Sequence, residues 1–98
     1  MTLPQVNISD DAEHDIDQIA AYTTMTWGWR QTDKYLGKLE DCFDLLAKSP
    51  FIGRPCDSIR SGLRRFEIGR HAVFYLPQSS GVLIVRVLHE DMLPSNYL

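Results

Sequence analysis

The fold is decided by the stretch Val82-Leu83-Ile84-Val85-Arg86-Val87-Leu88, in which the arginine is the one polar interruption of an apolar run. A short apolar run rich in β-branched residues predicts a strand covered on both faces, so we expect it in the middle of a sheet. A half-buried arginine needs a partner, because an unpaired charge away from water is costly. The sequence leaves two explanations of Arg86 open: it pairs with a carboxylate inside the fold, or it acts at the face of the sheet.

Two shorter runs of β-branched and aromatic residues precede this strand, at 63–68 and 71–76. Gly69-Arg70 separates these runs from each other, and residues 77–81 separate the second run from the strand at 82–89. Turn-forming residues between short runs of this kind predict a three-stranded antiparallel meander. Residues 51–55 contain a glycine and a proline and are expected to form a loop.

The first half of the chain has the period of helices. After a short strand expected at 3–8, either Ser9 or Asp10 can cap a helix, and Asp10 and Glu13 have the spacing of a capping box. Gly28 suits the end of this helix, and Ser49-Pro50 suits the end of a second one. The face at helical spacing in the first helix contains Ala12, Ile16, Ile19, Ala20, Thr23 and Trp27.

The expected order is therefore β-α-α-β-β-β, an α+β fold in which an antiparallel helical hairpin covers one sheet in two layers. A chain of 98 residues forms one core, so we expect a single domain over residues 1–98. The opposite face of the sheet has no helix of its own and its edges are unprotected, which favours a partner protein there. The core and rim of the hairpin are expected to hold Tyr22, Trp27, Trp29 and Tyr35.

The charges are unevenly distributed along the chain. Residues 1–50 hold nine acids and four bases, whereas residues 51–98 hold six arginines, no lysine and four acids. The net charge of −3 argues against a protein whose main work is binding nucleic acid phosphates. The arginines form either a modestly basic solvated face or a localised surface suited to bidentate recognition.

Several classes of protein are disfavoured by the composition. No stretch approaches the roughly 20 apolar residues that cross a bilayer, and the first residues lack the features of an export signal. Cys42 and Cys56 are too few for a disulfide framework, and no Cys/His group has the spacing of zinc ligands. We expect a cytoplasmic protein with reduced thiols, no metal and no cofactor, and with Cys42 in the core.

Local motifs occur in a fixed order from Ser9 to His89. The first helix carries Ser9-x-x-Ala12-x-x-Asp15-Ile16-x-x-Ile19, followed by Trp27-Gly28 at the hairpin turn and by Tyr35-Leu36-x-x-Leu39. The longest motif is Pro50-x-x-Gly53-Arg54-x-Cys56-Asp57-x-Ile59-Arg60-x-Gly62-Leu63-Arg64-Arg65-Phe66. It continues through Gly69-x-His71-x-x-Phe74-Tyr75 to Val85-Arg86-Val87-Leu88-His89. In this order and spacing the motifs resemble ParE toxins of the ParE/RelE superfamily, the toxin half of bacterial type II toxin–antitoxin pairs.

The resemblance implies a specific function. ParE-type toxins trap DNA gyrase on cleaved DNA, block replication and are silenced by a ParD-type antitoxin whose flexible C-terminal segment folds along the toxin. Such a protein is not an enzyme, and it meets DNA only through the antitoxin or gyrase. The resemblance therefore implies a hetero-oligomer with the antitoxin. Family members often carry a base after the His-Glu pair, whereas Asp91 follows His89-Glu90 here.

Two other functions stay open. The RelE branch of the superfamily cleaves messenger RNA on the ribosome, which needs a base, an acid and cations around the phosphate. Arg64, Arg65 and Arg86 could supply the positive charge, and proton transfer could involve Tyr75, Glu90 or His89, of which His89 has the best-placed ordinary pKa. The acidic total and the missing lysines disfavour this hypothesis. A non-toxic member that only forms a complex with its antitoxin is the third possibility.

We therefore favour a gyrase inhibitor whose candidate target-binding or partner-binding residues are Arg64, Arg65, Arg86 and His89. Arg64 and Arg65 are neighbours on a strand, so their side chains point to opposite faces, and one of them is expected to pair with an acid of the helices. His71 and His89 lie at strand ends, where hydrogen bonding is the simplest role. A ribonuclease of the RelE kind would instead use His89, Arg64 and Arg86.

Overall fold

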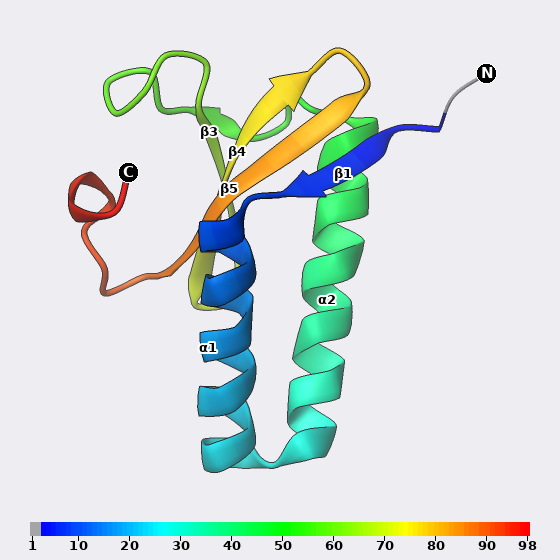
Figure 1. Cartoon of the computed structure of the whole chain (residues 1–98), viewed down its shortest axis with the longest axis vertical. Coiled ribbons are helices and arrows are strands. Elements are labelled where there is room, and N and C mark those ends of the chain that lie inside the picture. Colours follow the sequence, from blue (N-terminus) through cyan, green and yellow to red (C-terminus); the bar gives the residue numbers. More distant parts are fainter. Residues whose placement is uncertain (1–2) are drawn as a thin grey trace.

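The sheet lies on one side of the molecule and two long helices lie on the other (Figure 1). The computed structural model describes residues 3–98. The strands are β1 (Gln5–Ile8), β2 (Arg54–Pro55), β3 (Arg64–Ile68), β4 (His71–Gln78) and β5 (Gly81–His89), and the helices are α1 (Asp10–Trp27), α2 (Trp29–Lys48) and the short 3-10 helix η1 (Pro94–Asn96). The predicted α+β architecture is confirmed.

The sheet has the order β1-β5-β4-β3-β2. Strands β3, β4 and β5 form the predicted antiparallel meander, and β1 pairs with β5 in parallel. Strand β5 has neighbours on both sides, as its apolar sequence predicts. The expectation of a plain loop at 51–55 is wrong at its end, because Arg54 and Pro55 pair with β3 as an edge strand. Two residues are too few to show a period of two in the sequence.

The helical hairpin turns at Gly28, whose φ of 90° lies in a region that a residue with a side chain rarely adopts. Ser9 caps α1, because its Oγ accepts a hydrogen bond from the backbone N–H of Ala12 at 3.0 Å. Asp10 is the first residue inside the helix, so the expected capping box of Asp10 and Glu13 is wrong. Among residues 3–98, no helix is long and apolar enough to span a membrane.

The main core lies between the hairpin and the sheet. Residues of α1 and α2 pack there against the inner face of β4 and β5, with Ala12, Ile19, Leu39, Phe43, Leu46, Val73, Tyr75, Ile84 and Val87 all buried. The hairpin is longer than the sheet is wide, so its turn projects beyond the strands (Figure 1). Trp27 therefore has no sheet to pack against and is 72% exposed, which makes the prediction that it belongs to the apolar face wrong. Cys42 is buried as predicted, and burial raises its pKa to about 11.

The opposite face of the sheet is not open, contrary to the expectation from the sequence. A second cluster, of Leu63, Ala72, Phe74 and Leu88, lies on this face. Residues of the loop after β2 and of the C-terminal tail (residues 90–98) pack against it, namely Cys56, Ile59, Met92 and Leu98. Neither segment has the periodicity of a helix or strand, so no pattern in its residues indicates that it covers the sheet.

Candidate functional site

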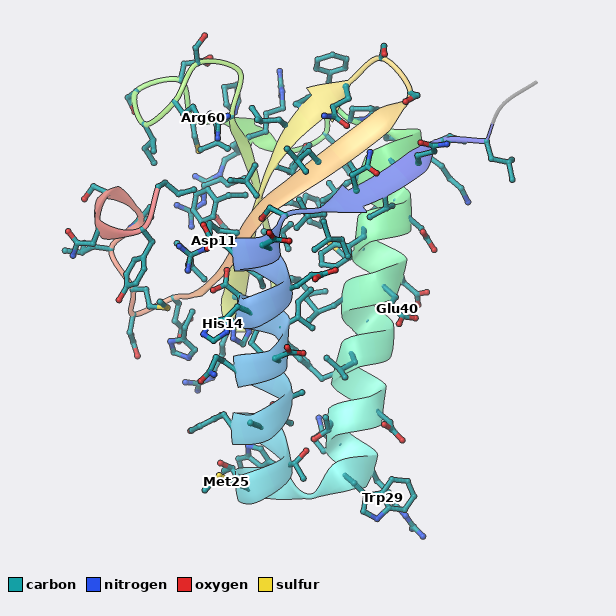
Figure 2. The ribbon with its side chains drawn as sticks, viewed as in Figure 1. Asp11, His14, Met25, Trp29, Glu40 and Arg60 are labelled. Carbon is teal, nitrogen blue, oxygen red and sulfur yellow. The ribbon has the colours of Figure 1, made fainter. Side chains whose placement is uncertain are left out.

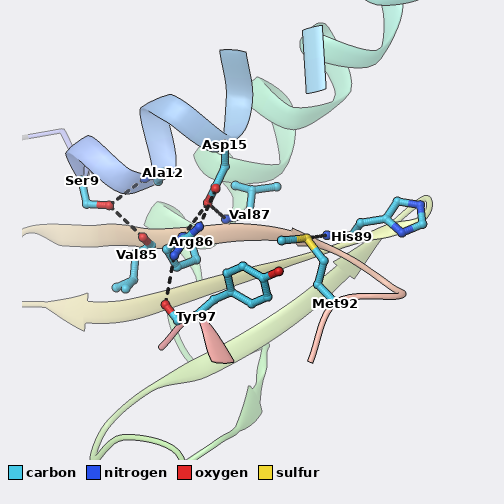
Figure 3. Close-up of polar contacts among 9 residues, drawn as sticks. All are labelled: Ser9, Ala12, Asp15, Val85, Arg86, Val87, His89, Met92 and Tyr97. Carbon is cyan, nitrogen blue, oxygen red and sulfur yellow. Dashed lines mark hydrogen bonds and ion pairs between the residues drawn. The ribbon is translucent and has the colours of Figure 1, made fainter. Parts of the chain in front are cut away.

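Side chains at the start of helix α1 form hydrogen bonds with the part of the β5 edge that β1 does not cover. Strand β1 ends at Ile8, opposite Ile84, so the following residues of β5 have no partner strand on that side. The Ser9 hydroxyl donates a hydrogen bond to the carbonyl of Val85 at 2.7 Å. One carboxylate oxygen of Asp15 accepts a hydrogen bond from the N–H of Val87 at 2.9 Å (Figure 3). The side chains of α1 thus replace a missing strand.

Arg86 is part of the same network. Its Nε and Nη2 each donate a hydrogen bond to the carboxylate of Asp15 at 2.8 Å, in a bidentate pair. Its Nη1 donates to the carbonyl of Tyr97 at 3.0 Å, which fixes the C-terminal tail (Figure 3). The side chains of Asp15 and Arg86 are only 8% and 16% exposed, and the bond to Asp15 raises the pKa of the arginine. Of the two explanations left open by the sequence, the structure shows the pairing within the fold.

Arg64 holds the loop that connects α2 to β2. Its Nη1 donates hydrogen bonds to the carbonyl of Phe51 at 3.0 Å and to that of Gly53 at 2.6 Å. The N–H of Gly53 donates to the hydroxyl of Tyr75 at 2.9 Å, and this hydroxyl donates to the carbonyl of Pro50 at 2.8 Å. We call this arrangement the loop clamp. Several residues of the motif from Pro50 to Phe66 therefore hold this loop in place within the fold.

The prediction that one of the neighbouring arginines pairs with an acid of the helices is wrong. Arg65 lies 3.3 Å from Glu67 on its own strand, and its guanidinium lies over the ring of Phe74. The acids of α1 lie beside β5, where Arg86 meets Asp15, while β3 is two strands away. Tyr75 is completely buried, and desolvation by burial raises its pKa, so it serves the loop clamp rather than proton transfer.

A groove of about 1070 Å³ runs along α1 from the C-terminal tail to the hairpin turn. We call it the hairpin groove. It contains all three histidines of the chain, and its walls come from α1, α2, the β3–β4 turn and the end of β5. Its lining includes His14, Asp15, Tyr22, Trp27, Tyr35, Lys38, Arg70, His71, Arg86 and His89. Of the four candidates from the sequence, Arg86 and His89 line the groove, while the guanidinium of Arg64 lies at the loop clamp.

His71 lies between an aromatic hydroxyl and a second histidine. Its Nδ1 and the hydroxyl of Tyr35 are hydrogen-bonded at 2.6 Å, and its ring meets the ring of His89 edge-on at 5.3 Å. His89 accepts a hydrogen bond from the N–H of Asp91 at 3.2 Å. Within residues 3–98, no three His, Cys, Asp or Glu side chains are placed to hold a metal ion. Sequence reasoning missed the groove because its residues come from segments that share no motif.

The groove is cationic in a protein that is acidic overall. Its lining carries the cations Lys38, Arg70 and Arg86 and the carboxylate Asp15, which is already paired with Arg86. Arg70 forms an exposed ion pair at 3.5 Å with Glu90, which lies outside this lining. Most of the acids of α1 point elsewhere, since Asp10, Asp11, Glu13 and Asp17 are exposed outside this lining. Apolar and aromatic side chains make up much of the remaining wall. The groove can therefore hold an amphipathic segment that carries negative charge.

We expect His71 to make the fold less stable in mild acid. Its pKa is lowered from 6.5, first by burial and then by His89, while Glu90 acts in the opposite direction. Above pH 6.5 the imidazole is neutral in both states, but below it the unfolded chain takes up the proton more readily. Stability should therefore fall as the pH drops below 6.5 and through the folded pKa. Urea denaturation between about pH 7.5 and pH 5 checks this, with His71→Gln as the comparison. An equally steep fall in the variant would contradict the assignment to His71.

Residues 6–94 match the family model described as "ParE toxin of type II toxin-antitoxin system, parDE". The chain belongs to this ParE family. It is 38% identical to Toxin ParE1 of Mycobacterium tuberculosis over 86 residues, which are 87% of this chain and 88% of that protein. It is 36% identical to Toxin ParE1 of Caulobacter vibrioides over 85 residues, again 87% and 88% of the two chains. Toxin ParE of Escherichia coli is 33% identical over 86 residues, 87% of this chain and 84% of that protein.

A solved structure has the same fold as this ParE chain. It is described as the chromosomal ParDE TA system from P. aeruginosa, and the two chains superpose with a TM-score of 0.73. The match covers 89% of this chain and 96% of that chain at 16% sequence identity. The arrangement of a strand, a helical hairpin and a meander is thus shared at low identity. The resemblance to ParE toxins that the sequence motifs predict is confirmed.

Proposed function

We propose that this ParE toxin inhibits DNA gyrase by binding it, without a chemical step, and that a ParD-type antitoxin neutralises the toxin. Membership of the ParE family supports a toxin of a type II toxin–antitoxin system. The placement of Arg64 and Arg86 supports the proposal that the toxin acts without a chemical step. Both guanidinium groups are held by acceptors of the fold itself, one at the loop clamp and one at Asp15.

A ribonuclease of the RelE kind would need these two arginines and His89 around one phosphate. A cation stabilises a transition state only if it is aimed at the developing charge. Arg64 donates to backbone carbonyls of residues 51 and 53, whereas Arg86 donates to α1 and to the C-terminal tail. His89 lines the hairpin groove, where its Nδ1 accepts a hydrogen bond from the N–H of Asp91 and lies 3.5 Å from the carboxylate of Asp91. This geometry favours binding over phosphodiester cleavage.

The antitoxin segment is proposed to occupy the hairpin groove. The cations Lys38 and Arg70 lie on its wall, so acidic residues of a partner would face them while its apolar residues cover the aromatic lining. A segment that folds on binding can cover such a long open surface. Because it binds only the folded toxin, it should also raise the melting temperature by mass action.

The decisive experiment measures gyrase and RNA in parallel. Purified toxin is added to gyrase, supercoiled DNA and ATP, and separately to a translating extract. We expect cleaved DNA to accumulate in the first assay, uncut messenger RNA in the second, and both mixtures to behave as if toxin were absent once antitoxin is added. Cleavage of messenger RNA without gyrase trapping would establish the RelE-like activity instead. Antitoxin binding with neither effect would identify the non-toxic, complex-forming member.

His89→Gln separates the two mechanisms within the same assays. If His89 transfers a proton, its loss should reduce activity by roughly 10²–10⁴-fold. If the toxin acts by binding, the change removes at most a hydrogen bond of about 0.5–1.5 kcal/mol, so gyrase inhibition should weaken without vanishing. Circular dichroism of the variant excludes a loss of folding as the cause.

A further inference from the structure

The free end of the helical hairpin carries a group of exposed large side chains. Tyr22, Met25, Trp27 and Trp29 are 68%, 88%, 72% and 63% exposed, although such residues usually avoid water. We call these four residues and Arg30 the hairpin tip. Met25 and Trp29 lie at the end of the hairpin farthest from the sheet (Figure 2). Met25 extends from α1 and Trp29 from α2 on opposite sides of this end in the view of Figure 2, so the exposed apolar side chains surround the end of the hairpin. A group of exposed apolar side chains of this kind marks an interaction surface.

The hairpin tip rests on a well-fixed turn. The hydroxyls of Thr24 and Thr32 are hydrogen-bonded to each other across the two helices at 2.7 Å. The Thr32 hydroxyl also donates to the carbonyl of Gly28 at 3.1 Å, and the N–H of Gly28 donates to the carbonyl of Thr24 at 3.0 Å. The guanidinium of Arg30 lies 5.3 Å from the centre of the Trp29 ring. A partner therefore meets a surface whose backbone needs little ordering on binding.

The charge around the hairpin tip differs from that of the rest of the chain. Residues 18–32 contain no acid and one base, Arg30, and the exposed residues Asp33 and Lys34 that follow have opposite charges. Residues 10–17, by contrast, contain five acids, and the whole chain has a net charge of −3. A complementary partner is an apolar pocket with a carboxylate at its rim. Tryptophan, tyrosine and arginine are also the residues that most often dominate the binding energy of protein interfaces.

Two other occupants fit this surface less well. In a symmetric contact between two copies, the same patch meets itself, so two Arg30 side chains would approach each other, and none of the five tip residues is an acid. The nearest acid in sequence is Asp33, one turn further along α2. Nucleic acid binding draws most of its affinity from several phosphate contacts, and a single arginine supplies too few. A protein pocket of negative charge is the occupant that the composition favours.

We infer that the hairpin tip is the surface through which this toxin enters a pocket of gyrase, an inference that rests on the proposed function. Trp29, Met25 and Arg30 are the contacts specific to this partner, because they do not line the hairpin groove. Tyr22 and Trp27 belong both to the tip and to the groove lining. A segment in the groove therefore covers one side of the tip, so antitoxin and gyrase compete for the same aromatic side chains.

The test uses two tip variants of the full chain, Met25→Ser/Trp29→Ser and Arg30→Glu, with Leu45→Ser as the matched control. Leu45 is an apolar residue of α2 that is 44% exposed and lies outside the tip. For the wild type and the three variants we measure the toxin concentration that traps half of the gyrase, the dissociation constant for antitoxin and the melting temperature. We expect the double variant to need at least about tenfold more toxin, Arg30→Glu to need several times more, and the control to match the wild type. Antitoxin affinity should change by less than about threefold in both tip variants, because neither removes a groove residue.

The outcomes separate the two proposals. If the wild type traps gyrase and the tip variants, folded by their melting temperatures, trap it equally well, the tip assignment is wrong and the function stands. If the tip variants lose antitoxin affinity and keep gyrase trapping, the tip is an antitoxin surface and the assignment is again wrong. Self-association of the wild type that the tip variants abolish would show a second copy as the occupant instead. A wild type that does not act on gyrase at all overturns the proposed function, and the tip assignment with it.

Discussion

Replacing Arg86 by alanine is expected to lower the free energy of unfolding by about 3–5 kcal/mol, the usual cost of removing one partner from a buried ion pair. The variant removes both arginine donors from the carboxylate of Asp15, which is only 8% exposed in the wild type, and leaves the N–H of Val87 as its remaining donor in the network. Small domains have total stabilities of about 5–15 kcal/mol, so such a loss would be a large fraction of the total. Urea denaturation measured as a midpoint and a slope checks the prediction.

Two further variants test whether burial is the cause. Asp15→Asn in the Arg86→Ala background keeps an acceptor for Val87 and removes the unpaired charge, so it should recover part of the lost stability. Arg70→Ala breaks the ion pair with Glu90, whose side chains are 78% and 54% exposed, and should change stability by at most about 1 kcal/mol. If Arg86→Ala cost no more than Arg70→Ala, the network beside β5 would not stabilise the fold as described.

Adding one methyl group at Gly53 is expected to destabilise the protein by about 1–3 kcal/mol. A Cβ there would lie 2.4 Å from the hydroxyl oxygen of Tyr75 and 2.8 Å from the carbonyl oxygen of Arg65. The backbone of β3 cannot move away without breaking its pairing with β2, and a displaced Tyr75 would lose its bonds to residues 50 and 53. Thermal or urea denaturation of Gly53→Ala should show the loss.

Gly37 provides the matched control, because the same methyl group has the opposite effect there. It lies inside α2, and a Cβ at this position meets nothing within 4 Å. Glycine is less favourable than alanine in a helix interior, so Gly37→Ala should raise stability by about 0.5–1 kcal/mol. If Gly53→Ala and Gly37→Ala changed the stability in the same direction, the loop clamp would not be the reason why residue 53 must be glycine.

The parts of the fold that could be predicted are those that local patterns determine. The meander and the hairpin follow from the period of apolar residues and from turn formers such as Gly28 and Gly69. The cover on the far face of the sheet could not be predicted, because Ile59 and Leu98 lie in segments without a period. The exposure of Trp27 could not be predicted for a related reason, because helical spacing indicates the face on which a residue lies but not whether the sheet extends that far.

The candidate site shows the same division. The sequence singled out Arg86 as needing a partner, but its partner Asp15 is 71 residues away and only the parallel pairing of β1 with β5 brings them together. Arg64 and Tyr75 attracted functional hypotheses because their side chains can bind anions or transfer protons. Their contacts with residues 50–53 exist only in three dimensions. The hairpin groove joins residues from five segments, and a linear motif cannot describe it.

The pairing of β1 with β5 also has a consequence for the order in which the molecule assembles during synthesis. Residues 5–8 cannot form their strand pairing until residues 81–84 have been synthesised, and the contact between Arg86 and Tyr97 forms later still. The helical hairpin needs only neighbours in sequence and forms early, since local contacts require little loop closure. Its apolar side then stays uncovered until the last strand has left the ribosome. The finished groove and the fixed C-terminal tail thus form only after residues 81–97 have been synthesised, and a shorter nascent chain carries neither of them.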